Sequence, residues 1–181
     1  MERKCKMKKE GGSLKKTGIA KACSITAAVL MILVIAVALP LTVPKLFGIS
    51  IYNLLTPSME PAMPVGSAVY TMACSPETLQ PGEIVCYEAG EDTALVQTHR
   101  VVENDSKNQQ LITKGDANAE TDATPVSYDR VVGKVVCSIP MLGAVSEALH
   151  AGGGIAVCIA IFAMAFILWT LADKIKKESF K

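Results

Sequence analysis

The chain has 181 residues, half of them hydrophobic and only 5% aromatic, which favours one modest domain over several. The formal net charge of +1 conceals an uneven distribution, because both ends are basic and the middle is acidic. Residues 48–150 contain five Lys or Arg against more than twice as many Asp or Glu, which argues against a nucleic-acid partner.

Two uncharged apolar stretches, residues 22–44 and 151–172, are candidates for membrane spans. A helix of roughly 20 apolar residues crosses a hydrocarbon layer of about 30 Å, and both stretches are long enough. We therefore expect a transmembrane signal anchor at 22–47 and a second transmembrane helix at 151–172. About 100 residues, 48–150, remain between them, which is enough for one small core.

The flanking charges predict the topology. Residues 1–21 carry eight Lys or Arg against two Glu, and four Lys lie in the tail 173–181. The positive-inside rule then places both termini in the cytoplasm and residues 48–150 outside the cell, in a multi-pass protein of the cell membrane. A cleavable signal peptide is the alternative for the first 40 residues. However, the apolar run exceeds a usual h-region of 7–15 residues, and no A-x-A-like site obviously follows it.

The outer segment reads as a small β domain. Short β-branched runs alternate with connections rich in Pro, Gly, Asn, Asp and Ser, which favour turns. The predicted strands are SAVYTMA (67–73), EIVCYE (83–88), LVQTHRVVE (95–103), QQLITKG (109–115) and RVVGKVVCSI (130–139). Such a pattern indicates a compact, mostly antiparallel sheet or barrel, and residues 142–149 could add a short helix.

Three of the six cysteines, Cys74, Cys86 and Cys137, fall in the outer segment. An odd number allows at most one disulfide among them, and which pair would form it is left open. No Cys-x-x-Cys or Cys/His spacing of a metal site occurs. We therefore expect these cysteines to be small buried hydrophobic residues.

Ser58 lies in the stretch TPSMEPAMP, residues 56–64, about a dozen residues after the first span. It is either an ordinary turn residue or a nucleophile held in a rigid loop. A serine nucleophile needs a base, and His99 is the one histidine well inside the outer segment, since His150 borders the second span. A lone strand histidine is more often structural. Methionines near the serine either pack in the core or rest on lipid.

Two aspartates follow the strand that ends at Gly115. Asp116 and Asp122 are each able to orient an imidazole and stabilise its protonated form, and each is also able to cap a turn. A further alternative is Lys114 as the base of a Ser-Lys dyad, although this would need a strongly lowered pKa. Spacing alone leaves these alternatives open.

Five boxes occur in order along the outer segment: SMEP (58–61), PGEIV (81–85), THRVV (98–102), TKGDAN (113–118) and VVGKV…IPMLG (131–143). On these boxes the chain resembles type I signal peptidases, specifically the ER-type branch in which a histidine replaces the general-base lysine. The short chain with its own C-terminal span is similar to the Gram-positive W-type form.

The resemblance implies a mostly β catalytic domain held by a membrane anchor. It assigns Ser58 as the nucleophile, His99 as the general base and Asp122, rather than the also functional Asp116, as the triad acid. The substrates would be membrane-inserted pre-proteins, cleaved after small residues at −1 and −3, with no metal or organic cofactor. The competing hypothesis is a non-catalytic membrane protein whose β domain binds an extracellular partner. Nothing in the sequence indicates an oligomeric state.

Overall fold

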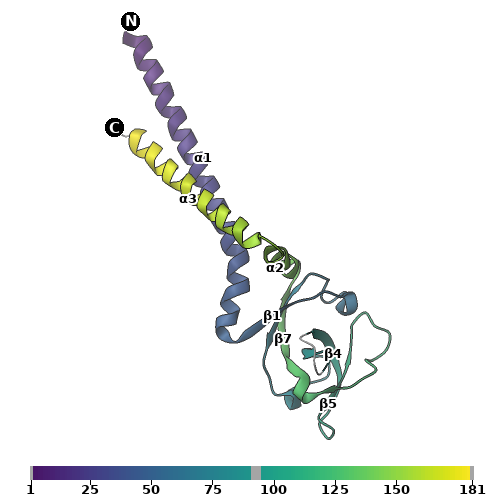
Figure 1. Cartoon of the computed structure of the whole chain (residues 1–181). Coiled ribbons are helices and arrows are strands. Elements are labelled where there is room, and N and C mark those ends of the chain that lie inside the picture. Colours follow the sequence, from purple (N-terminus) through teal and green to yellow (C-terminus); the bar gives the residue numbers. More distant parts are fainter. Residues whose placement is uncertain (1, 91–94, 180–181) are drawn as a thin grey trace. The chain divides into compact units, whose positions relative to one another are not determined.

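A computed structural model of the chain describes residues 2–90 and 95–179 (Figure 1). It divides into two compact units, one formed by residues 1–39 and 152–181 and the other by residues 40–151. The expected turn between the second and third predicted strands falls partly on residues 91–94, which lie outside the described residues.

The first unit consists of two long helices, α1 (Glu2–Thr42) and α3 (Gly154–Ser179). Their apolar segments, Gly18–Phe47 and Ala156–Lys177, are long enough to cross a bilayer, and few of their side chains are buried within the chain. Two such helices indicate membrane anchoring. The expected span boundaries and the orientation of the termini stay predictions.

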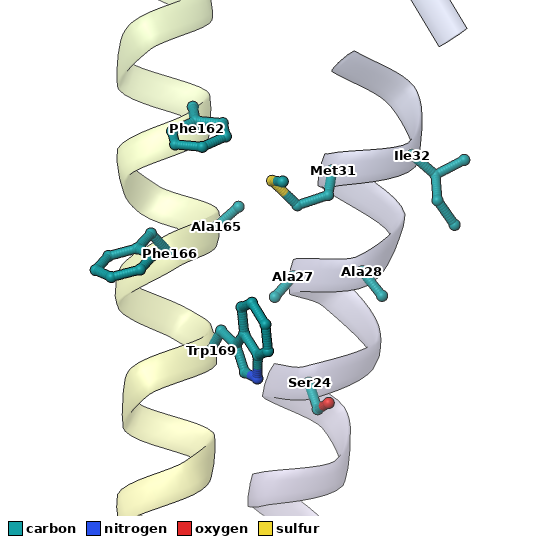
Figure 2. A pocket seen from close by; sticks show the side chains of 9 residues that line it. All are labelled: Ser24, Ala27, Ala28, Met31, Ile32, Phe162, Ala165, Phe166 and Trp169. Atoms are coloured by element: carbon teal, nitrogen blue, oxygen red, sulfur yellow. The ribbon is translucent and has the colours of Figure 1, made fainter. Parts of the chain in front are cut away.

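Each of the two helices has two buried alanines. Ala27 on α1 and Ala165 on α3 are both buried, and each has a second buried alanine seven residues away, Ala20 and Ala172. A seven-residue spacing is two helical turns, so the alanines of each helix share one face. Small residues let helix backbones approach closely in a membrane. Ala27 and Ala165 line an apolar groove of about 660 Å³, in which Trp169 and Met31 point toward the facing helix (Figure 2).

Two prolines lie where α1 ends. Pro40 is inside the last turn of α1, which continues to Thr42. Pro44 then occupies the first turn of a short 3-10 helix, η1 (Val43–Phe47), where a missing N–H leaves no intrahelical bond unmade. Gly48 closes η1 in a left-handed conformation and leads directly into the sheet.

The second unit is built on one antiparallel sheet of seven strands. They are β1 (Ile49–Asn53), β2 (Ala68–Met72), β3 (Ile84–Glu88), β4 (Val96–Asp105), β5 (Gln110–Lys114), β6 (Val126–Ser127) and β7 (Val131–Ile139). Their order across the sheet is β1-β2-β7-β3-β4-β5-β6. Helix α2 (Leu142–His150) follows β7, and the short 3-10 turns η2 (Pro57–Met59), η3 (Pro76–Thr78) and η4 (Tyr128–Arg130) lie in the connections.

The predicted fold class is confirmed: a mostly β domain stands between an N-terminal and a C-terminal apolar helix. All five predicted strands and the short helix are present. Two edge strands were missed. β1 begins two residues after the expected end of the anchor at residue 47, and β6 is only two residues long.

The buried residues of the sheet form two clusters. One contains Leu79, Val85, Tyr87, Val101, Leu111 and Val126. The other contains Leu54, Met59, Met63, Val69 and Cys86. Met59 and Met63 therefore pack in the core, which was one of the two alternatives for these methionines. Met72, in contrast, is about half exposed. The buried Met59 side chain anchors in the core the turn on which Ser58 lies.

The three cysteines of this unit are free thiols. Cys86 is buried, as expected, and accepts a hydrogen bond from the Thr71 hydroxyl at 3.1 Å. Cys137 does not fit the expectation of a buried residue, because β7 presents it on an exposed face.

Candidate active site

Ser58 sits in the middle of η2, between a proline and a fully buried methionine. The Ala117 N–H donates to the Ser58 carbonyl oxygen at 2.9 Å, which ties this turn to the loop after β5. The Thr56 and Ser58 hydroxyl oxygens lie 3.1 Å apart. The serine is thus held from both sides while its side chain remains partly exposed.

His99 lies on β4, where it pairs with Val85 of β3. Its side chain is only 2% exposed, so its polar atoms need partners inside the protein. Its Nδ1 lies 2.6 Å from Oδ2 of Asp122. A second neighbour on the same strand face is Gln97, whose amide nitrogen lies 3.2 Å from His99 Nε2 and 3.4 Å from Nδ1.

Asp122 is held in the loop after β5 by several bonds. Its N–H donates to the Thr113 carbonyl oxygen at 2.8 Å, and its Oδ2 accepts from the Thr113 hydroxyl at 2.6 Å. The Tyr87 hydroxyl donates to the same oxygen at 3.2 Å. Burial raises the pKa of Tyr87 well above its ordinary value, so this hydroxyl remains a donor.

Asp116 has a different partner. Its two carboxylate oxygens accept from Nε and Nη2 of Arg100 at 2.8 and 2.6 Å, in a bidentate pair. The hydrogen bond to Asp116 raises the pKa of Arg100 above its ordinary value. Arg100 also donates to the Gly82 carbonyl oxygen at 2.7 Å. Asp116 therefore fixes the turn after Gly115, whereas Asp122 is the aspartate beside His99.

Lys114, the alternative base, donates through its Nζ to the Ala119 carbonyl oxygen at 3.0 Å. The structure therefore brings together His99 and Asp122, with the Ser58 turn against β4, and leaves Asp116 and Lys114 in other contacts. In the described residues no hydrogen bond joins Ser58 to His99. Such bonds are often long in ligand-free sites and tighten when substrate binds.

Sequence reasoning missed four polar side chains around the site: Thr56, Tyr87, Gln97 and Thr113. A signal existed for two of them. Gln97 and His99 are two residues apart on one strand, and side chains at i and i+2 share a face. Thr56 stands two residues before Ser58 in an extended N-cap position. Tyr87 and Thr113 come from other strands, and only the pairing register brings them to Asp122.

In the residues that the structure describes, no group of three His, Cys, Asp or Glu side chains is placed to hold a metal ion. What the site does contain is a hydroxyl, an imidazole and a carboxylate, arranged so that the carboxylate meets Nδ1. That contact fixes the tautomer in which Nε2 carries a lone pair, as a general base for a serine requires.

Comparison with known proteins adds a relative. No family model matches the chain. Signal peptidase I W of Bacillus subtilis (strain 168) is 34% identical to it over 91 residues. The chain is a distant homologue of this peptidase. The match covers 49% of this chain and 47% of the relative, so the chain spans about half the length of the curated relative that it matches. The resemblance expected from the five boxes is thereby confirmed.

We predict that Gly115→Ala displaces the serine turn. A Cβ at this position would lie 2.7 Å from the Ser58 carbonyl oxygen and 2.8 Å from Nδ2 of Asn118. Because one of these atoms is backbone, the turn must move, and a shift of about 1 Å in a catalytic group costs on the order of 10²-fold in rate. Overpacking typically also costs about 1–3 kcal/mol of stability.

Cleavage of a pre-protein and thermal unfolding of the Gly115→Ala variant measure the two effects. Gly48→Ala is the control, because Gly48 has a left-handed backbone but no atom near its Cβ position. It should lose stability and keep activity. Full activity in Gly115→Ala would contradict the prediction.

Proposed function

We propose that the protein is a membrane-bound serine endopeptidase that removes signal peptides from exported pre-proteins. The observation that carries this proposal is the 2.6 Å contact between His99 Nδ1 and Asp122 Oδ2, in a domain homologous to a signal peptidase. The turn that holds Ser58 packs against the strand of that histidine.

In the proposed reaction His99 Nε2 takes the proton of the Ser58 hydroxyl while Oγ attacks the scissile carbonyl carbon. Asp122 stabilises the imidazolium that forms. The imidazolium then gives its proton to the leaving amine, and the peptide C–N bond breaks to leave an acyl-enzyme. A water molecule, activated by the same imidazole, attacks the ester and restores Ser58. No metal or organic cofactor enters these steps.

Two donors are available for the oxyanion. The Ser58 N–H is at the start of a 3-10 turn, where backbone donors have no partner inside the helix. The Thr56 hydroxyl lies 3.1 Å from the attacking oxygen. We take these two as the donors to the oxyanion that forms on the substrate carbonyl, and the loss of one such donor typically costs about 10²–10³ in rate.

The substrate would bind as an extended strand. The first part of β4, Val96–His99, pairs with β3 on one side, while β5 pairs with β4 only from Arg100 onward. Along Val96–His99, the described residues provide no strand on the β5 side. Peptides commonly add a strand to such a free edge, which here would lead the scissile bond to Ser58 and His99.

The membrane arrangement belongs to the same proposal. The apolar helices would hold the enzyme in the cell membrane, with both termini in the cytoplasm and the β domain outside. Substrates would be pre-proteins whose own apolar segment lies in the bilayer. Small side chains would be required at −1 and −3, as the resemblance to signal peptidases implies.

The test is to co-express the full chain with a secreted pre-protein and to sequence the N-terminus of the product. We expect cleavage after a small residue at −1, and loss of cleavage when that residue is changed to tryptophan. A pre-protein that remains uncut with every signal peptide tried would favour the alternative, a β domain that binds an extracellular partner.

A further inference from the structure

One face of the sheet changes from apolar to polar beside the candidate active site. Along β3, β4 and β5 this face carries the buried apolar side chains of Val85, Val101 and Leu111. Val85 pairs with His99, and Val101 pairs with Thr113. The face therefore continues with the polar side chains of His99 and Thr113. Tyr87 lies on the same face, because it is two residues along β3 from Val85.

Tyr87 reaches His99 diagonally across the strand pair. Its register partner is Gln97, and diagonal neighbours on one face are within reach of an aromatic side chain. The two rings lie edge to face with their centroids 6.2 Å apart. Tyr87 is 3% exposed, so its hydroxyl must find partners inside the protein.

The Tyr87 hydroxyl lies 3.2 Å from Asp122 Oδ2 and 3.2 Å from His99 Nδ1. The shorter distance of 2.6 Å between that nitrogen and Asp122 commits the Nδ1 proton to the carboxylate. The tyrosine proton therefore goes to the carboxylate as well. Burial raises the pKa of Tyr87, which keeps the proton on its oxygen.

We propose that Tyr87 is a positioning residue, whose hydroxyl holds the Asp122 carboxylate and thereby sets the proton affinity of His99. The proposal rests on the proposed function insofar as His99 acts as the base. The hydroxyl contributes a third donor to Oδ2, after His99 and Thr113. The hydrogen bond from the Tyr87 hydroxyl neutralises part of the negative charge on the Asp122 carboxylate. The carboxylate then stabilises the imidazolium less strongly.

Among the described residues, Asp122 is the charged side chain that pairs with His99. Its effect on the imidazole is therefore the one that Tyr87 can change. Gln97 on β4 is an uncharged neighbour of the imidazole. Arg130 acts electrostatically on Tyr87 rather than through a bond to it, and Arg100 is paired with Asp116.

The expected effect of Tyr87→Phe follows from this charge distribution. Without the hydroxyl the Asp122 carboxylate is more negative toward the imidazole, which favours the protonated form. His99 in the variant then stays protonated to higher pH than in the wild type. Because the base must be neutral to act, the acid limb of kcat/KM moves to higher pH. We expect kcat/KM on the plateau to fall about 3–10-fold, since the carboxylate is held by one bond fewer.

The chain makes a direct measurement possible because it contains only two histidines. The full chain, labelled with ¹⁵N-histidine in detergent or nanodiscs, gives two imidazole titrations by NMR, and His150 serves as the internal reference. This readout needs no peptidase activity, so it separates failure of the inference from failure of the proposed function.

Tyr70→Phe is the matched control. Tyr70 is also 3% exposed, and its hydroxyl donates to the Pro40 carbonyl oxygen at 3.0 Å. In the part of the chain that the structure describes, it makes no hydrogen bond to His99 or Asp122. We expect its His99 titration to match that of the wild type. An unshifted His99 titration in Tyr87→Phe, or an equal shift in both variants, would overturn the proposal.

Two further variants test the route through Asp122. Thr113→Val removes another donor to Oδ2 and should shift the NMR titration of His99 in the same direction. This variant replaces Tyr87→Phe as the test if that protein does not fold. In an Asp122→Asn background, Tyr87→Phe should no longer shift the NMR titration of His99, because the effects of two residues that act through one group are not additive. A shift that persists in that background would show that Tyr87 does not act through Asp122.

Discussion

Ser58→Ala is expected to abolish signal-peptide cleavage, with a loss on the order of 10⁶-fold in kcat, because no other group replaces the attacking oxygen. The fold should be unaffected. Among the described residues, the Ser58 hydroxyl has one side-chain partner, Thr56, and the carbonyl bond to Ala117 does not involve the side chain. Accumulation of uncut pre-protein, together with an unchanged unfolding temperature, is the measurement.

Three variants control this experiment. Ser50→Ala removes an exposed hydroxyl from β1 and should leave cleavage unchanged. Lys114→Met should also remain active, since the lysine ammonium is bound to the Ala119 carbonyl oxygen. His99→Ala should be inactive and also less stable, because it leaves a buried space and an unpaired carboxylate. Normal processing by Ser58→Ala would end the enzyme hypothesis.

The second large effect is a contrast between two aspartates that are six residues apart in sequence. Asp122→Asn should reduce kcat by about 10⁴-fold, because an amide in this place favours the wrong tautomer of His99. Its shape is nearly that of aspartate, so the domain should still fold. Asp116→Asn should lose less than tenfold in rate.

The reason for the smaller effect is that Asp116 pairs with Arg100 rather than His99. Part of this pair is exposed, so its loss should cost about 1 kcal/mol or less of unfolding free energy. Single-turnover cleavage and denaturant unfolding of both variants, compared side by side, measure the contrast. If Asp116→Asn were the inactive variant and Asp122→Asn the active one, the proposed role of Asp122 would be wrong.

Sequence patterns predicted the parts of the fold whose signals are local. The β-branched runs between turn residues predicted five strands, and their bounds agree with the structure to within two residues. The strands that were missed have weak local signals, since β6 has two residues and β1 follows the apolar helix almost without a break.

The candidate site divides in the same way. The sequence by itself determined that Ser58 and His99 were the residues to consider, because a stiff loop serine and one domain histidine are rare enough to stand out. The resemblance favoured Asp122 over Asp116, but only the tertiary structure shows which of the two carboxylates contacts His99. Both follow the same strand, and which carboxylate reaches His99 depends on the path of the loop after β5 and on the register of β4 with β5.

The same reason explains Tyr87 and Thr113, which the sequence did not mark at all. A hydroxyl on a strand is common, and its partner depends on which strands are neighbours and on how they are aligned. Here β3, β4 and β5 are adjacent, so the Tyr87 and Thr113 hydroxyls meet the carboxylate that faces His99. The sequence specifies the residue types, whereas the distances between side chains far apart in the chain are set only when the sheet forms.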